Sequence, residues 1–154
     1  MREFFLLIVE DDPDDQLILR EALRESSWKP RSSYYSDGER ALGFLRNLLE
    51  PGSEHEPLPD LILLDLKLPR LDGKEILRDL KGDPGLRRIP VVAMSTSQLE
   101  EDIDQSYELG AAAFLVKPDS FTGWVKVFRS LAGFWEDCVF LPLRNPSGKD
   151  AYGI

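Results

Sequence analysis

Short, wholly apolar runs constrain the fold of this chain more than any other feature of its sequence. Four of them have the length of a β-strand, at residues 4–9, 61–64, 91–94 and 113–116. A strand that is apolar on both faces is typical of a parallel sheet that helices cover on each side. A fifth segment, Arg31–Tyr35, is more polar and suits an edge strand.

Amphipathic patterns of helical period lie between and after these runs. We predict helices over residues 14–25 and 39–49, a third that ends near Gly82, a fourth that ends at Gly110, and a fifth over 121–131. Strands that alternate with helices in this way predict a doubly wound α/β fold with a five-stranded parallel sheet and five helices.

The composition excludes several classes of function. A length of 154 residues suits one domain, and a net charge of −9 gives no basis for binding nucleic acid. The chain has one histidine, His55, and one cysteine, Cys138, so it carries no His- or Cys-based metal centre and no internal disulfide. The N-terminal apolar run is too short for a signal peptide or a membrane span, so we expect a cytoplasmic protein without a membrane partner.

Acidic residues directly follow two of the apolar runs. Glu10 and Asp11 come after the first run, and Asp65 comes after the run at 61–64. The carboxyl ends of parallel strands meet at one edge of a sheet, so we expect these carboxylates to converge there. Two like charges about 4 Å apart repel by roughly 4 kcal/mol at an effective dielectric of about 20, so the cluster needs a proton or a hard cation. A partly hydrated Mg²⁺ is the usual solution.

Helix capping is the simpler interpretation of the acids that come next. Asp12 precedes Pro13, a residue typical of a first helical turn, and Asp14 and Asp15 suit the positive end of a helix dipole. Capping does not account for the three carboxylates that follow the strands.

Two more polar residues follow the remaining apolar runs. Ser95 comes after the run at 91–94, and Lys117 comes after the run at 113–116. A metal and a lysine neutralise phosphoryl oxygens, and a hydroxyl can donate a hydrogen bond to one of them. Each residue alone is a weak signal, but together with the acids they predict a phosphoryl-transfer pocket.

These motifs together resemble a response-regulator receiver domain. The matching segments are LIVEDDPDD, LILLDLKLPRLDG, RIPVVAMSTS and AAFLVKP, within residues 4–131. The resemblance implies a flavodoxin-like sheet of order 2-1-3-4-5 and a receiver domain over residues 1–132. The acidic insert at 50–59 and an aromatic tail make the chain more similar to the stand-alone receivers that partner phytochrome-type sensor kinases.

The resemblance implies a phosphoacceptor and its metal site. Asp65 would take a phosphoryl group from a sensor histidine kinase or a histidine phosphotransfer domain. Asp11, Asp65 and the backbone carbonyl of Lys67 would bind Mg²⁺, and Glu10 would help through water. We therefore expect a signalling module rather than an enzyme, one that at most assists its own phosphorylation and dephosphorylation.

The resemblance also implies roles for residues at the last two strand ends. Ser95 and Lys117 would contact the phosphoryl group. Phe114 would be an aromatic switch residue, although by default an aromatic residue in a strand belongs to the core. The bond between Lys117 and Pro118 would be cis, an isomer almost confined to proline.

Two other functions compete with this interpretation. A phosphatase of the haloacid-dehalogenase type also begins from a strand-end aspartate, but it needs a second aspartate at the position of Lys67. A pseudo-receiver, which binds partners without phosphorylation, would be expected to lack Asp11, Asp65 or Lys117, and all three are present.

Residues 133–154 form a C-terminal extension with more apolar side chains than a solvated tail would carry. We expect a homodimerisation arm, because large aromatic side chains left on a monomer surface would form an apolar patch. The helix face with Trp124 and Phe128 is the predicted two-fold contact. The alternative is an arm that folds back onto its own domain. The predicted arm contacts are Phe134, Trp135, Phe140 and Leu141.

Overall fold

A computed structural model, which describes residues 3–142, contains a five-stranded parallel sheet of order β2-β1-β3-β4-β5. The strands are β1 (Phe5–Val9), β2 (Arg31–Tyr35), β3 (Leu61–Asp65), β4 (Val91–Ser95) and β5 (Ala113–Val116). The helices are α1 (Pro13–Glu25), α2 (Gly38–Asn47), α3 (Gly73–Gly82), α4 (Glu100–Glu108) and α5 (Phe121–Leu131), and a π-helical turn, η1 (Ala132–Glu136), follows. The predicted fold and strand order are confirmed. None of the helices in the described part of the chain is long and apolar enough to cross a membrane.

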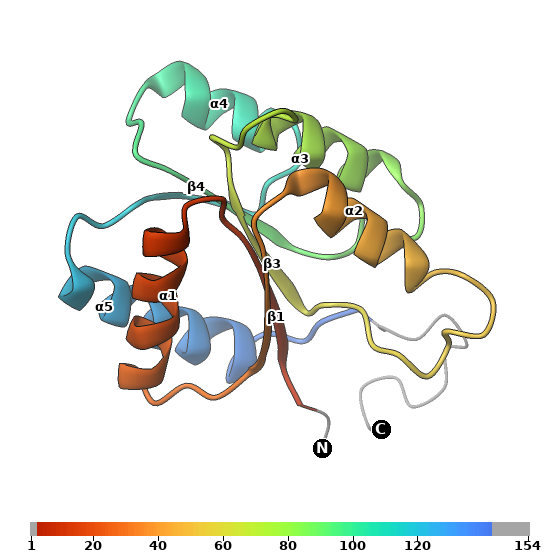
Figure 1. Cartoon of the computed structure of the whole chain (residues 1–154), viewed down its shortest axis with the longest axis horizontal. Helices are drawn as coiled ribbons and strands as arrows, with labels where there is room; N and C mark the ends of the chain where they lie inside the picture. Colours follow the sequence, from red (N-terminus) through yellow and green to blue (C-terminus); the bar gives the residue numbers. More distant parts are fainter. Residues whose placement is uncertain (1–2, 143–154) are drawn as a thin grey trace.

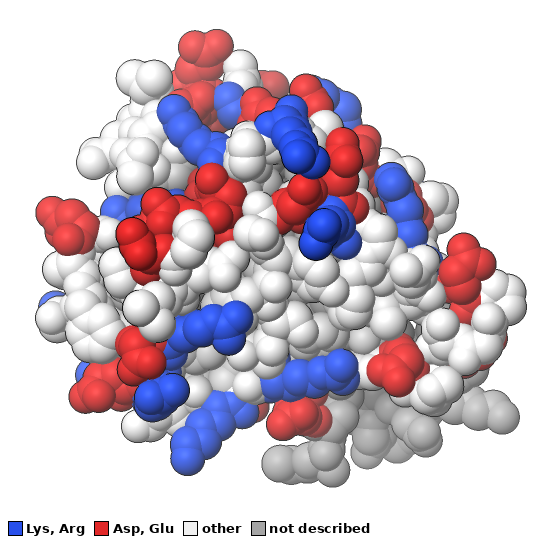
Figure 2. Space-filling model, in the orientation of Figure 1, with Lys and Arg blue, Asp and Glu red and all other residues white. Residues whose placement is uncertain are grey.

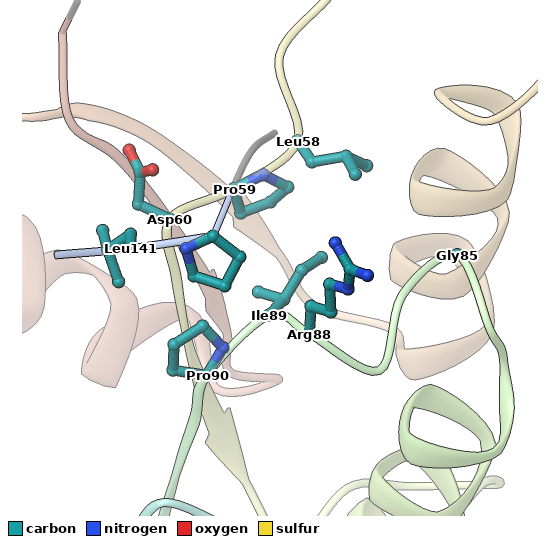
Figure 3. Close-up of a pocket in the computed structure, with 9 residues that line it drawn as sticks. Leu58, Pro59, Asp60, Gly85, Arg88, Ile89, Pro90 and Leu141 are labelled. Carbon is teal, nitrogen blue, oxygen red and sulfur yellow. The ribbon is translucent and has the colours of Figure 1, made fainter. Parts of the chain in front are cut away.

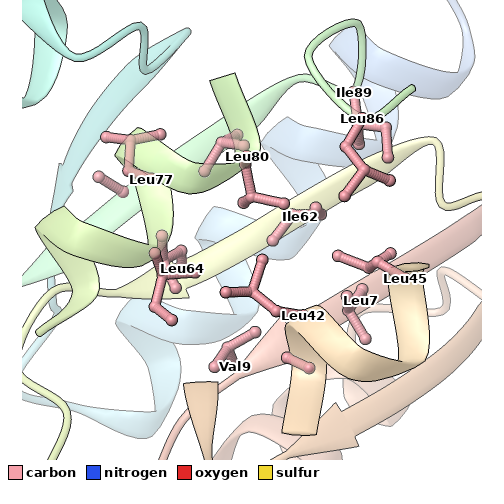
Figure 4. Close-up of a cluster of buried hydrophobic side chains, with 14 of the residues drawn as sticks. Leu7, Val9, Leu42, Leu45, Ile62, Leu64, Leu77, Leu80, Leu86 and Ile89 are labelled. Carbon is pink, nitrogen blue, oxygen red and sulfur yellow. The ribbon is translucent and has the colours of Figure 1, made fainter. Parts of the chain in front are cut away.

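Helices cover both faces of the sheet (Figure 1). α1 and α5 pack on one face, and α2, α3 and α4 lie over the other. Under α2 and α3, the side chains of Leu7, Leu42, Ile62 and Leu77 meet between the helices and the sheet (Figure 4). β1 and β3 are buried along their whole length because they occupy the middle of a doubly covered sheet, whereas the edge strand β2 is only partly buried.

Side-chain caps determine where four of the helices begin. An aspartate or serine accepts hydrogen bonds from backbone N–H groups of the first turn, as N-terminal caps do. These caps are Asp12 for α1, Asp37 for α2, Asp72 for α3 and Ser120 for α5. The capping interpretation of Asp12 is therefore confirmed. The helix α4 begins instead after Leu99, whose side chain makes no such bond.

The register of the strands brings the carboxyl ends of β1, β3, β4 and β5 to one edge of the sheet. The pairs that show this are Val9 with Leu64, Asp65 with Met94, and Ser95 with Val116. Residues that follow these strands therefore start from neighbouring positions, although they are far apart in the sequence.

Trp124 and Phe128 belong to the interior of the domain. Their side chains are 6% and 0% exposed and pack in the core between α1, α5 and the sheet. The prediction that they form a two-fold contact is therefore wrong, because a second copy cannot reach them. Helical spacing of apolar residues marks a buried face, but it does not distinguish a face buried in the domain from one buried against a partner.

The described part of the C-terminal extension, residues 133–142, folds back along its own domain. The indole N–H of Trp28 donates a hydrogen bond to Glu136 in η1. Leu141 is 9% exposed and packs on the core beneath α1 and α5. It also lines a small pocket with Ile89 and Pro90, which directly precede β4 (Figure 3). The position of Leu141 therefore agrees with the alternative prediction, in which the arm packs on its own domain. Residues 143–154 of the predicted arm lie outside the described residues.

Candidate functional site

Three carboxylates converge at the carboxyl edge of the sheet. Glu10 and Asp11 follow β1, Asp65 ends β3, and one carboxylate oxygen from each lies within 4.8 Å of the others. Glu10 is 1% exposed and Asp65 is 3% exposed, whereas Asp11 is only partly buried. Oxygen ligands at this spacing, with one side open to water, fit a hard divalent cation such as Mg²⁺. The predicted convergence of these acids is confirmed.

The Lys117 ammonium group lies between two of these carboxylates. Its Nζ donates hydrogen bonds to Oε1 of Glu10 at 2.5 Å and to Oδ2 of Asp65 at 2.7 Å, and it lies 3.9 Å from Oδ2 of Asp15. The backbone N–H of Lys117 donates to the Ser95 carbonyl at 2.8 Å, which extends the pairing of β5 with β4 past the strand ends. From the end of β5, the side chain therefore reaches Asp65 at the end of β3 and Glu10 directly after β1.

The peptide bond between Lys117 and Pro118 is trans, as are the other peptide bonds of the described chain. The predicted cis bond is therefore wrong. An X–Pro bond favours trans by about 0.5–1 kcal/mol. With the trans isomer, the Lys117 side chain already reaches both Glu10 and Asp65.

Burial and charge set the protonation of the site. Burial raises the pKa of Glu10 to about 7, because the hydrogen bond from Lys117 only partly offsets it and the neighbouring Asp65 adds to it. Burial alone would lower the pKa of Lys117, but its hydrogen bonds to the two carboxylates outweigh this and raise that pKa. Lys117 therefore stays charged at neutral pH, while Glu10 carries a proton part of the time. A cation bound among the acids would displace that proton.

Both oxygens of Asp65 are held in place. Oδ1 accepts a hydrogen bond from the backbone N–H of Lys67 at 2.9 Å, and Oδ2 accepts the bond from Lys117. The Lys67 side chain is exposed and lines a groove that also contains Asp11 and Ser95. The carboxylate thus has a fixed orientation, and its neighbours Leu66 and Lys67 line the groove beside it.

Gly73, in the first turn of α3, is a site residue that sequence reasoning missed. A Cβ atom at this position would lie 2.4 Å from the backbone oxygen of Asp65 and 2.4 Å from the Cα of Leu66. The Gly73 N–H also donates to the Leu66 carbonyl at 3.1 Å. α3 therefore packs directly on the backbone beside Asp65. The available signal was a glycine directly after the capping residue Asp72, because glycine is the residue that lets another backbone approach closely.

Ser95 and Phe114, the two residues of the predicted switch, lie on the adjacent strands β4 and β5. Ser95 is 1% exposed, and its Oγ accepts a hydrogen bond from the backbone N–H of Ser97 at 3.1 Å. Phe114 is partly buried against the core under α2 and α3, and its backbone N–H donates to the hydroxyl of Tyr107 at 3.2 Å. This position of Phe114 suits an ordinary core residue and does not distinguish that role from the predicted switch.

Acidic side chains gather over the carboxyl end of β1 and the start of α1 (Figure 2). Elsewhere on this face, lysines and arginines are interspersed with acids and do not form one large patch. An anionic phosphodonor would thus approach an acidic edge, and a bound cation would reduce the repulsion.

Comparison with known proteins agrees with this geometry. The family model for the response regulator receiver domain matches residues 6–127. Response regulator Rcp1 of Synechocystis is 39% identical over 137 residues, which cover 89% of this chain and 92% of Rcp1. The crystal structure of the phosphorylated cyanobacterial phytochrome response regulator RcpA superposes with a TM-score of 0.81 at 36% identity, covering 92% of this chain and all of RcpA.

A third comparison bears on the metal. The Mn²⁺-bound form of Rcp1 superposes with a TM-score of 0.77 at 37% identity, covering 91% of this chain and 99% of that structure. Receivers are signalling domains and not classical enzymes, which sets the phosphatase alternative aside. With its receiver fold and its acidic cluster at the carboxyl edge of the sheet, the chain belongs to the response regulator receiver family.

Proposed function

We propose that the protein is a single-domain response regulator that accepts a phosphoryl group on Asp65 from a sensor histidine kinase. The supporting observation is the buried Asp65 carboxylate, which Lys117 holds beside Glu10 and Asp11 at the carboxyl edge of the sheet. An open groove lined by Asp11, Lys67 and Ser95 adjoins this cluster. In the transfer, an Asp65 oxygen attacks the phosphorus of a phosphohistidine. The phosphorus–nitrogen bond breaks, the imidazole leaves and takes up a proton, and an acyl phosphate remains on Asp65.

The residues around Asp65 would stabilise charge as it moves onto the phosphoryl oxygens. Lys117 is already bonded to Asp65 and would transfer that hydrogen bond to a phosphoryl oxygen. Ser95, at the end of the adjacent strand, would donate its hydroxyl to another. Mg²⁺, held by Asp11, Asp65 and the Lys67 carbonyl with Glu10 acting through water, would neutralise the equatorial oxygens when bound.

Phosphorylation would reach the surface through Ser95 and Phe114. A phosphoryl oxygen would draw the Ser95 hydroxyl inward, and the Phe114 ring would fill the space that this movement vacates. Beryllofluoride should therefore shift NMR signals around Phe114 in the wild type. Equal shifts in Ser95→Ala would refute the coupling.

A phytochrome-type sensor kinase is the donor that we propose. The support is the similarity of the chain to Rcp1 and to the phytochrome response regulator RcpA over nearly its whole length. A cytoplasmic location is part of this proposal and agrees with the absence of any cysteine pair. Phosphotransfer from a purified phytochrome kinase should be much faster than from a histidine kinase of unrelated input; equal rates would argue against this donor.

Small phosphodonors test the chemistry without knowledge of the kinase. Acetyl phosphate with Mg²⁺ should add the mass of one phosphoryl group to the intact protein, and chelation of the metal should abolish the addition. Asp65→Asn should not be labelled, whereas Asp14→Asn, which removes an exposed acid from the same edge, should be labelled like the wild type. Labelling of Asp65→Asn at the wild-type level would show that the assignment is wrong.

We also propose a homodimer in which the C-terminal extension contacts the second copy. Phe134 and Phe140 are 56% and 83% exposed, and burial of their aromatic rings against a second copy would be energetically favourable. Light scattering of the wild type should report a dimer at tens of micromolar. The double variant Phe134→Asp, Phe140→Asp should weaken this dimer. The control Phe121→Asp, which changes an exposed aromatic residue on α5, should leave it unchanged. A wild type that stays monomeric, phosphorylated or not, would rule the dimer out.

A further inference from the structure

The helix α4 has fewer apolar anchors than the other helices of the described chain. Ser106 is its only buried residue, whereas α5 buries Trp124, Val125 and Phe128. Its first turn also lacks the side-chain cap that the other four helices have. Since little apolar surface fixes this helix, its polar contacts must largely determine its position.

A network of short polar contacts ties α4 to α3. The ammonium group of Lys74, in the first turn of α3, donates to Oδ1 of Asp102 at 2.7 Å and to Oε1 of Gln105 at 2.6 Å. The Lys74 and Asp102 side chains are only 23% and 20% exposed, so water screens this ion pair less than a pair on the open surface. The other carboxylate oxygen of Asp102 accepts a hydrogen bond from the hydroxyl of Ser97 at 2.6 Å.

Ser97 connects this network to the phosphorylation site. Its backbone N–H donates to Oγ of Ser95 at 3.1 Å, and its own hydroxyl accepts a hydrogen bond from the N–H of Leu99, where α4 begins. Ser95, Lys74 and Asp102 also line the same groove. An unbroken chain of hydrogen bonds therefore runs from the Ser95 hydroxyl to α4 and α3.

We propose that Lys74, Ser97 and Asp102 form a polar latch that holds α4 against α3 and is coupled to the position of the Ser95 hydroxyl. The coupling rests on the proposed function, in which Ser95 moves toward a phosphoryl oxygen. That movement takes Oγ away from the N–H of Ser97, so the loop between β4 and α4 must rearrange, and the contact of Ser97 with Asp102 is lost. Coupling is reciprocal, so a weakened latch favours the phosphorylated conformation.

Two variants remove the latch from opposite ends. Lys74→Met removes the charge and keeps most of the length of the side chain, and Asp102→Ala removes the shared acceptor. Asp104→Ala, on an exposed position of the same helix, is the matched control. Asp102→Asn, which keeps the volume, replaces Asp102→Ala if that variant does not fold, as judged by its circular dichroism spectrum.

Hydrogen exchange of the α4 amides in the unphosphorylated protein tests the latch itself. Exchange in both latch variants should be about tenfold faster than in the wild type, which corresponds to about 1.4 kcal/mol. Because both variants remove the contact between Lys74 and Asp102, the double variant should exchange more slowly than the two single effects would predict if they were additive. Rates equal to those of the Asp104→Ala control would overturn the latch.

Beryllofluoride binding tests the coupling separately. Each latch variant should bind beryllofluoride with Mg²⁺ about fivefold more tightly than the control. This ratio is at the lower end of the affinity changes typical of coupling between two sites. Faster exchange with unchanged affinity would overturn the coupling. A wild type that neither binds beryllofluoride nor takes up phosphate would instead overturn the proposed function and the coupling with it, while the exchange rates still decide whether the latch exists.

Discussion

Replacing Glu10 with glutamine should stabilise the metal-free protein at pH 8. The carboxyl is 1% exposed, and its pKa is raised from 4.5 to about 7, mainly because of burial. In the unfolded chain it ionises at its ordinary value, so between these pH values the folded state holds a proton that the unfolded state has lost. The free energy of unfolding must therefore fall as pH rises through this window.

The size of the effect follows from the displaced pKa. One pKa unit is equivalent to about 1.4 kcal/mol, so ionised Glu10 costs the folded state about 3 kcal/mol at pH 8 and almost nothing near pH 4. A glutamine side chain resembles the protonated acid. Its carbonyl can accept the hydrogen bond from Lys117, and its amide can donate toward Asp65, so the variant avoids this cost.

The assay is urea unfolding in the presence of a chelator, followed by circular dichroism from pH 5 to pH 8. The stability of Glu10→Gln relative to wild type should rise by about 2–3 kcal/mol over that range. The pKa of Asp15 is also raised by burial, but this contribution is present in both proteins. Glu108→Gln, at an exposed position on α4, is the control, and its free energy of unfolding should change with pH as that of the wild type does.

Magnesium supplies the second half of the test. A cation bound among the carboxylates stabilises ionised Glu10, so the advantage of the variant at pH 8 should shrink when Mg²⁺ is added. Parallel pH curves for wild type and Glu10→Gln, or a variant less stable than wild type at pH 8, would refute the account of the site's electrostatics.

Three further substitutions test other parts of the structure. Lys67→Ala should shorten the lifetime of the acyl phosphate, because the exposed cation at the groove can pair with the phosphoryl group or obstruct the attacking water; equal decay rates would refute this. Gly73→Ala should cost about 1–3 kcal/mol of stability, measured by urea unfolding, and should slow labelling by acetyl phosphate, because a Cβ at this position would collide with backbone beside Asp65. Phe128→Ala should cost about 3–5 kcal/mol in the same unfolding assay while leaving any self-association unchanged, because the ring is fully buried within its own domain.

Most of the fold could be predicted from the sequence because its signals are local. Apolar runs such as 61–64 and 91–94 can be buried on both faces only in a covered parallel sheet, and the helices between them begin at capping residues such as Asp12. Once the strands are parallel, the acids that follow β1 and β3 must share an edge. The convergence of Glu10, Asp11 and Asp65 was therefore predictable from order along the chain.

The tertiary structure decided what depends on neighbours distant in the sequence. The same helical spacing at Trp124 and Phe128 suits a dimer contact or a core, and only the packing of α5 against α1 and the sheet selects the core. The latch between Lys74 and Asp102 joins residues 28 positions apart, and no local pattern predicts it. The elevated pKa of Glu10 likewise arises from burial. Burial and the distance between charges are properties of the folded chain, because both depend on which segments, distant in the sequence, the fold brings together at one point.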